Sequence, residues 1–205
     1  MRQTGAVPRP VEFWFEFAST YSYPAAARIQ QHAAIVGAAV VWRPFLLGPI
    51  FQRQGWNDSP FNLYPVKGQY MWRDLERVCE KHRLPFRRPS VFPRNGLLAA
   101  RVAGVASAEG WADQLVPAVY HANFVADRDI SDAAVLAELI AGAHHDPAAA
   151  LERAQATASK DRLRESTDEA VRRGIFGAPS FLVGDELFWG HDRMDDALAW
   201  ACRGA

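Results

Sequence analysis

Four consecutive residues near the N-terminus, Ser19-Thr20-Tyr21-Ser22, all carry hydroxyl groups. They follow a strand-like apolar segment and precede Pro24, a residue suited to the first turn of a helix. The start of a helix favours an anion such as a thiolate, because its N–H groups lack partners and its dipole is positive there. A thiol oxidoreductase would carry a CxxC motif at this place, and this chain has none. A hydroxyl can donate a hydrogen bond to sulfur but cannot exchange disulfides, so the segment predicts a protein that uses the thiol of a ligand.

Two segments near the C-terminus are further candidates for the site. Gly177-Ala178-Pro179 precedes an apolar strand pattern at 180–183, where the proline either opens the strand in the trans form or introduces a cis bond. Trp189-Gly190-His191-Asp192 precedes the last helical pattern, and Asp192 has the place of an N-cap. Asp192 therefore caps the helix, binds a cation of a ligand, or does both.

Metal and cysteine chemistry have little support in the sequence. The chain has six scattered histidines and two cysteines, Cys79 and Cys202, which are far apart. A zinc site needs clustered ligands, and a disulfide framework needs more cysteines. We therefore expect no metal and interpret the two thiols as incidental.

Alternating and helical patterns divide the chain into three parts. The segment 11–17 alternates like a largely buried strand, Ala25 to Val36 reads as a helix that Gly37 ends, and 38–43 reads as a second buried strand. Prolines and glycines exclude a long regular element at 44–66. Helical patterns then follow from Lys67, and further ones are expected at 95–108, 111–125, 131–143, 147–156 and 161–173. Strands at 180–183 and 186–189, joined by a Gly-Asp turn, precede a helix at 193–202.

This order predicts an α/β fold of the thioredoxin-like type, with a βαβ half, a helical insertion and a ββα half. We assign 11–66 and 174–205 to one discontinuous thioredoxin-like domain and 67–173 to an inserted helical domain. Separate small domains would leave a βαβ fragment with too little core. In this fold a cis-Pro179 would face the start of the first helix, and Ala178 would offer its N–H and C=O to an extended, peptide-like ligand. The sequence does not decide whether Pro179 is cis.

Composition limits the partners of the protein. The chain has 205 residues, with 23 Lys plus Arg and 23 Asp plus Glu, so its net charge is zero. No overall basic field is available to hold a nucleic acid. The longest apolar run, 33–42, is too short to cross a membrane, and the first ten residues lack the apolar core of a secretory signal. We expect a cytoplasmic protein that binds neither nucleic acid nor membrane.

The segments FEFASTYSYPA, WRPFLLGPIF, SPFNLYPVKGQYMWRDLER and GIFGAPSFLVGDELFWGHDRMD together resemble the 2-hydroxychromene-2-carboxylate isomerase family. That family is related to the kappa-class glutathione transferases within the DsbA-like branch of thioredoxin folds. The resemblance covers residues 11–202. The family motif at the helix start is Ser-Pro-Tyr-Ser-Tyr, and Thr20 replaces its proline here.

The resemblance implies glutathione as cofactor and assigns roles to individual residues. Ser19 matches the serine that contacts the glutathione sulfur, and Ala178, before Pro179, matches the residue that pairs with the cysteinyl backbone. His191 and Asp192 match the pair that holds the γ-glutamyl end. The remaining residues expected at the cofactor are Thr20, Tyr21, Asn62, Lys67, Trp189 and Gly190.

The implied reaction is a glutathione-dependent cis–trans isomerisation of an aromatic 2-oxo acid in aromatic-compound catabolism. The thiolate adds reversibly to the alkene, Ser19 stabilises that thiolate, and the substrate is a small aromatic carboxylate. Two alternatives stay open: a kappa-like glutathione transferase and a non-catalytic DsbA-like binding protein. A homodimer is also possible.

Two further groups of residues are candidates for contact with the substrate. A basic segment could attract carboxylates or form a solvated loop; its members are Lys81, Arg83, Arg87, Arg88 and Arg94. A set of aromatic and basic residues could line a pocket for a flat ligand or belong to the core; its members are Arg43, Phe45, Trp56, Tyr64 and Trp72.

Overall fold

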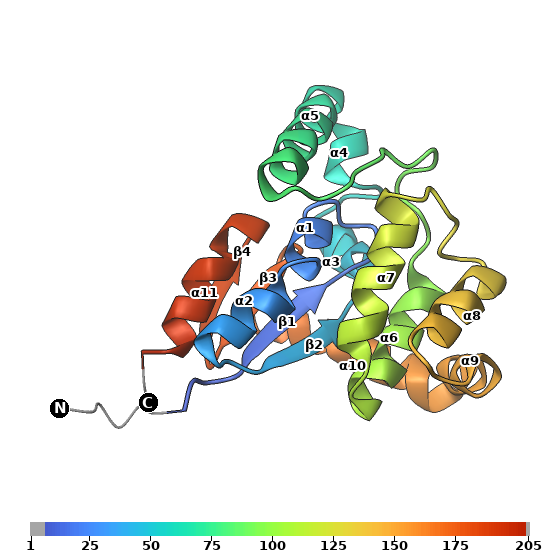
Figure 1. Cartoon of the computed structure of the whole chain (residues 1–205). Coiled ribbons are helices and arrows are strands. Elements are labelled where there is room, and N and C mark those ends of the chain that lie inside the picture. The colour runs from blue at the N-terminus through green and yellow to red at the C-terminus, as the bar shows by residue number, and fades with distance from the viewer. Residues whose placement is uncertain (1–6, 204–205) are drawn as a thin grey trace.

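A four-stranded mixed sheet lies at the centre of the computed structural model, which describes residues 7–203. The strand order is β2-β1-β3-β4, where β1 is Val11–Phe15, β2 Val40–Pro44, β3 Ser180–Val183 and β4 Glu186–Trp189. Strands β1 and β2 are parallel, whereas β3 is antiparallel to both β1 and β4. The predicted thioredoxin-like fold, with its helical insertion between β2 and β3, is confirmed (Figure 1).

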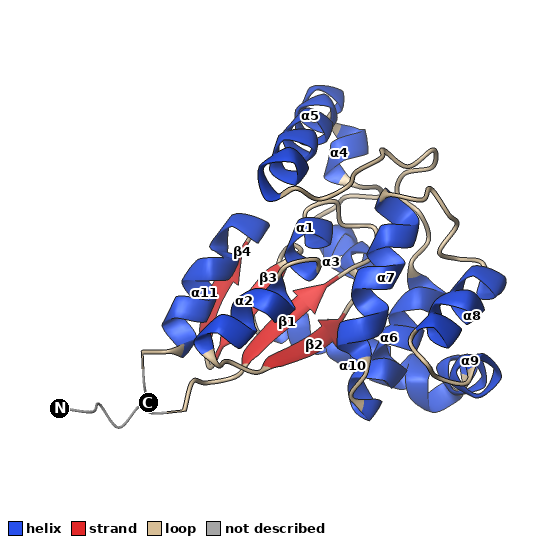
Figure 2. Ribbon diagram, viewed as in Figure 1, coloured by secondary structure: helices blue, strands red, loops and turns tan. Residues whose placement is uncertain are grey.

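Helices cover both faces of this sheet (Figure 2). Those of the first and last parts of the chain are α1 (Ser22–Ala26), α2 (Ile29–Val36), α3 (Leu47–Arg53), α4 (Pro60–Leu63), the 3₁₀ turn η1 (His191–Arg193) and α11 (Met194–Ala201). Those between them are α5 (Pro65–His82), α6 (Leu97–Glu109), α7 (Ala112–Phe124), α8 (Ala133–Gly142), α9 (Pro147–Gln155) and α10 (Thr157–Arg172). No helix within 7–203 combines the length and apolar character needed to cross a membrane.

Strand β1 faces two hydrophobic cores because successive side chains point to opposite faces of a sheet. Phe13 and Phe15 belong to the larger core, which extends into α6 and α7. Trp14 belongs to a smaller core on the other face with Phe45 and Leu182. The predicted burial of Trp14 is thus confirmed. Side chains on both faces of β1 are buried, so packing fixes the position of the strand that precedes the Ser19 loop.

The expected helix from Ala25 to Val36 is broken at Ala27 and Arg28. The Pro24 carbonyl accepts a hydrogen bond from Arg28 Nε at 2.8 Å, in place of the Arg28 N–H of a regular helix. The Arg28 N–H instead donates to Ala25 O, one residue closer. The first helix after Ser19 therefore has only five residues.

Other element boundaries differ from expectation at helix ends. The segment 44–66 contains two short helices and the start of α5, so its prolines begin helical turns as well as interrupting them. Helix α10 begins at Thr157 rather than 161, directly after α9, because Ala156 is at once the C-cap of α9 and the N-cap of α10. The expectation that Asp192 caps the last helix is wrong, because Asp192 lies inside η1 and Arg193 is the N-cap of α11.

Candidate functional site

Two loops far apart in the sequence meet at the carboxyl end of β1. The Ser19 hydroxyl donates a hydrogen bond to the carbonyl oxygen of Ala178 at 2.9 Å. The Ala178–Pro179 peptide bond is cis. The Ala178 N–H has no hydrogen-bond partner within residues 7–203. The structure therefore places the hydroxyl-rich segment directly against the residue that the sequence singled out for pairing with an extended ligand.

Helix α7 holds the loop that carries Ser19. Tyr120 Oη donates to Glu16 O at 2.8 Å, and Asn123 Nδ2 donates to Phe17 O at 3.1 Å. The Ser19 N–H also donates to Glu16 O, at 3.0 Å. Sequence reasoning missed Tyr120 and Asn123. Asn123 offered a signal, since a polar residue in an otherwise apolar helix needs a partner when it is buried.

Arg94, which the sequence placed in a basic segment facing ligand or solvent, is buried and structural. Its guanidinium donates to Asn123 Oδ1 at 3.1 Å and pairs with Asp127. Hydrogen bonds from Ser90 and Arg94 lower the pKa of Asp127 to about 2. Arg94 thus supports Asn123, which in turn holds the Ser19 loop.

Tyr21 connects the Ser19 loop to the segment 189–192. Its ring stacks on His191 with a centroid distance of 5.3 Å and an interplanar angle of 7°. Its hydroxyl donates to Asp74 Oδ2 at 2.8 Å. His191 Nδ1 is buried without a partner among the described residues, and burial lowers the pKa of His191. An imidazole whose Nδ1 lacks a partner among residues 7–203 is therefore held beside the loop.

Arg28 lies behind His191 and is a third residue that sequence reasoning missed. Its guanidinium is buried, with Nη2 3.5 Å from His191 O and Nη1 3.4 Å from His82 Nδ1. Burial, and then the Arg28 charge, lower the pKa of His82. Arg28 thus adds positive charge next to the segment expected to hold the end of a ligand.

The segment 189–192 packs against the cis-proline loop. Gly190 N–H donates to Pro179 O at 2.9 Å. The Trp189 ring covers Gly177 so closely that a Cβ there would lie 2.5 Å from Trp189 Nε1. Trp189 also packs on Phe176 at 4.8 Å, and both rings are about half exposed. Asp192 is exposed, and its nearest ionic partner is Arg193 at 3.4 Å.

Asn62 and Lys67 are not brought into contact with Ser19. Asn62 Nδ2 donates to both carboxylate oxygens of Asp58 at 3.2 Å. Lys67 Nζ lies 5.8 Å from the centroid of the Phe61 ring, which in turn lies 6.5 Å from the Tyr21 ring. Lys67 is thus linked to the loop only through two aromatic rings.

A surface cavity of about 470 Å³ lies between α5 and the segment that follows it. Trp72, Arg88, Phe92 and Asn62 line it, and the Arg88 guanidinium lies 4.8 Å above the Trp72 ring. The expected aromatic pocket is otherwise not formed. Phe45 is in the smaller core, Arg43 lies over Trp14, Trp56 packs on Phe51, and Tyr64 is exposed.

Several buried polar groups surround Ser19. Burial raises the pKa of the Glu16 carboxyl to about 7, although an interaction with the Ala18 N–H partly opposes this shift. Thr20 Oγ1 and Ser22 Oγ are buried without hydrogen-bond partners in the described part of the chain.

The thiols are elsewhere: Cys79 is buried in α5 with its pKa raised to about 12 by burial, so it is a poor nucleophile. No group of three or more potential metal ligands occurs within 7–203.

A family model described as a DSBA-like thioredoxin domain matches residues 10–199. The chain belongs to this family. It is 30% identical over 188 residues to a 2-hydroxychromene-2-carboxylate isomerase of Sphingobium xenophagum, covering 91% of this chain and 95% of the relative. It is 26% identical to a glutathione S-transferase kappa 2 of Caenorhabditis elegans, covering 90% and 88%. A solved structure of a 2-hydroxychromene-2-carboxylate isomerase superposes with a TM-score of 0.83 at 26% identity, covering 94% of this chain and 96% of that one. The protein is therefore a DSBA-like family member similar to these isomerases.

Proposed function

We propose that this protein is a glutathione-dependent cis–trans isomerase that acts on aromatic 2-oxo acids of the hydroxychromene carboxylate type, in aromatic-compound catabolism. The observation that carries the proposal is the 2.9 Å hydrogen bond from Ser19 to the residue before cis-Pro179, in place of a CxxC motif. The similarity to a named isomerase over 91% of the chain supports the reaction type. A homodimeric state and a cytoplasmic location stay predictions.

The residues around Ser19 fit glutathione as a ligand. The Ala178 N–H, which has no partner within residues 7–203, suits strand-like pairing with a cysteinyl backbone. Thr20 and His191 add buried polar atoms that lack partners in residues 7–203. Tyr21 supports His191 by stacking. The segment 189–192 contacts the cis-proline loop through Gly190 N–H and Pro179 O. His191 and Asp192 would hold the γ-glutamyl end, and Trp189 and Gly190 would contact the cofactor.

The Ser19 hydroxyl has one proton, which it donates to Ala178 O in this structure. If the backbone of a ligand pairs with Ala178, the ligand N–H can donate to that carbonyl instead. The Ser19 O–H can then donate its hydrogen bond to a sulfur atom. Such a bond stabilises the thiolate and so lowers the pKa of the thiol. When bound, glutathione would supply a thiolate that adds reversibly to the conjugated alkene, so that the former double bond can rotate. Ser19 would keep that thiolate ionised near neutral pH.

The aromatic acid would bind on the α5 side of the site. Arg88 over Trp72 offers a cation next to an aromatic surface, which suits a flat carboxylate. Lys67 lies 5.8 Å from the Phe61 ring, which in turn lies near Tyr21, and it would add a second positive charge. Asn62 lines the cavity and would contact the substrate or the cofactor.

The deciding experiment is an ultraviolet titration of glutathione with the protein at neutral pH, compared with Ser19→Ala and with Ser131→Ala. Ser131 is an exposed serine far along the chain that bonds to Asp129, so its variant controls for the substitution itself. We expect thiolate absorbance with wild type and Ser131→Ala but not with Ser19→Ala. Isomerase turnover should fall about 100-fold or more in Ser19→Ala, the usual effect of losing one preorganised donor.

A kappa-like transferase is the second candidate, favoured by the similarity to a glutathione S-transferase kappa 2. The two functions differ in whether glutathione is consumed. An isomerase leaves the glutathione concentration unchanged after many turnovers, whereas a transferase depletes it in proportion to product. Wild-type rates in Ser19→Ala would contradict the role of Ser19 in both functions. Glutathione binding by the wild-type protein without either activity would favour a protein that only binds.

A further inference from the structure

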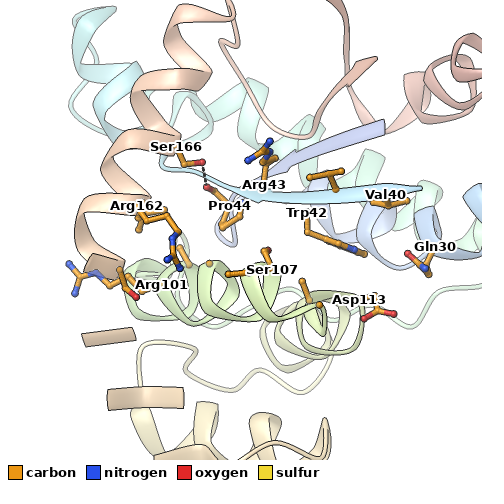
Figure 3. Close-up of a pocket in the computed structure, with 18 residues that line it drawn as sticks. Gln30, Val40, Trp42, Arg43, Pro44, Arg101, Ser107, Asp113, Arg162 and Ser166 are labelled. Carbon is orange, nitrogen blue, oxygen red and sulfur yellow. Dashed lines mark hydrogen bonds between the residues drawn. The ribbon is translucent and has the colours of Figure 1, made fainter. Parts of the chain in front are cut away.

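A cavity of about 530 Å³ lies along the outer edge of the sheet, between β2, α6 and α10 (Figure 3). None of its lining residues belongs to the Ser19 loop, the cis-proline loop or the segment 189–192. Its volume is within the range of small-molecule sites. The proposed isomerase function does not use this cavity.

One end of the cavity is cationic. Arg101 of α6 and Arg162 of α10 lie together there (Figure 3). Neither arginine forms an ion pair with any residue from 7 to 203, although most arginines of this chain do. Arg101 Nε and, further along α6, Ser107 Oγ are also buried without hydrogen-bond partners in this part of the chain. Buried donors without partners cost free energy, so an acceptor from a ligand would be favoured here.

The middle of the cavity combines apolar surface with backbone donors. Val11 N–H donates to Ala39 O, and Phe45 N–H donates to Phe15 O. In β2 and at its two ends, the backbone N–H and C=O groups of odd-numbered residues therefore point toward β1. The N–H and C=O of Trp42 therefore point outward to the cavity, because successive residues alternate. The next outward carbonyl, that of Pro44, is already bonded to Ser166 Oγ at 2.7 Å.

The opposite end of the cavity is not cationic. Asp113 and Gln30 lie there, with Trp42 between them and the arginine pair (Figure 3). Arg43 also lines the cavity, but its charged group does not point into it. Its guanidinium lies over the Trp14 ring and 3.7 Å from Glu12, on the other side of β2. The positive charge is thus confined to one end.

We propose that this cavity binds a small organic carboxylate. The carboxylate would lie between Arg101 and Arg162, where guanidinium groups bind it in a planar, charge-assisted geometry. The apolar body of the ligand would lie along Trp42 and Leu163, and a hydrogen-bond donor at its far end would meet Asp113. This is a second ligand site, separate from that of Ser19.

The test is calorimetric titration of the full chain with naphthalene-2-carboxylate. The variants are Arg101→Gln, Arg162→Gln and Arg164→Gln. Arg164 is the matched control, because it is on the same helix, is largely exposed and pairs with Asp161 outside the cavity. We expect binding that weakens about tenfold or more in each of the first two variants and is unchanged in Arg164→Gln. Circular dichroism should show wild-type folding for all three.

Three further comparisons separate this site from others. Binding in the cavity of Arg101 and Arg162 should persist in Ser19→Ala and in Arg88→Gln, because those residues belong to the candidate isomerase site and its neighbouring cavity. Arg88→Gln should remove only the ligand bound over Trp72. The neutral naphthalene-2-carboxamide and inorganic phosphate should each bind at least about tenfold more weakly, since one lacks the charge and the other the apolar body. Equal binding of phosphate would overturn the ligand class. The site would be overturned by loss of all binding in Ser19→Ala or Arg88→Gln, or by no binding to the wild type. It would also be overturned if Arg101→Gln changed a dimer to a monomer and no ligand bound.

Discussion

At the scale of single residues, Glu16 carries a half-buried carboxyl three positions before Ser19. Its pKa is raised from 4.5 to about 7 by burial, so the folded protein holds a proton that the unfolded chain has lost in this range. The folded state thus binds more protons than the unfolded state, and the free energy of unfolding falls as pH rises from about 4.5 to about 7. Above that range the folded state carries the full cost of a buried charge.

Glu16→Gln should remove this pH dependence. The variant should match wild type near pH 4 and be more stable near pH 8, by at most about 3 kcal/mol from the size of the pKa shift. Urea unfolding at several pH values measures this difference. Glu165→Gln, on the exposed surface of α10, is the control and should run parallel to wild type. Parallel curves for Glu16→Gln and wild type would show that the carboxyl is ionised when folded.

Residues of the site differ in how far sequence reasoning could place them. The proximity of Ser19 to Ala178 could be predicted, because both flank strands whose pairing the fold dictates. The contacts of Tyr120 with the Ser19 loop could not, because they depend on how α7 docks on the sheet. The sequence pattern placed Arg94 in a basic segment that faces ligand or solvent, because its partner Asp127 is distant in sequence.

At the scale of elements, helix α7 positions the Ser19 loop through side-chain donors. Tyr120→Phe keeps the ring packing but removes the donor to Glu16 O, so it should destabilise by about 1–3 kcal/mol. It should also increase hydrogen exchange at the Ser19 N–H, which donates to the same carbonyl. Amide exchange by mass spectrometry measures the effect. Tyr70→Phe, at an exposed position on α5, should leave it unchanged. Equal protection of this loop in Tyr120→Phe and wild type would exclude a positioning role.

The cis-proline loop and β4 are in such close contact that a methyl group does not fit between them. In Gly177→Ala the new Cβ would lie 2.5 Å from Trp189 Nε1, so the indole must move away from the loop. We expect lower stability and weaker glutathione binding. Adding Trp189→Ala should recover part of the stability, which a double-mutant cycle detects as a coupling energy. Gly142→Ala, where a Cβ meets nothing within 4 Å, is the control. Purely additive effects would contradict the contact.

Element types were predicted better than element ends. Alternation and helical spacing identified β1, β3, β4 and most helices, because each pattern extends over several residues. The break after α1 depends on a single side chain, Arg28, reaching the Pro24 carbonyl. The end of the chain gave a similar result, since η1 moved the N-cap of α11 from Asp192 to Arg193. Such local competition between side chain and backbone leaves no periodic signal.

At the scale of the whole molecule, the helical insertion and the sheet share one core. Tyr120 of α7 packs on Phe17 at 5.0 Å and on Phe15 at 6.4 Å between ring centroids. At the other end of the insertion, Ala170 of α10 joins Trp14 in the smaller core. The division at 67–173 stays a prediction, and because the two parts share this core, we infer that neither part is stable alone.

Thermal unfolding should therefore be a single cooperative transition. Far-ultraviolet circular dichroism, dominated by the helices, and tryptophan fluorescence, which includes Trp14 and Trp42 of the sheet, should give the same midpoint. The calorimetric and van't Hoff enthalpies should agree. Tyr120→Ala removes a fully buried ring at the junction and should lower the free energy of unfolding by about 3–5 kcal/mol. Both midpoints should fall together. If Tyr120→Ala lowered only the midpoint seen by circular dichroism, the insertion would unfold separately. The sheet next to Ser19 would then stay folded without α7.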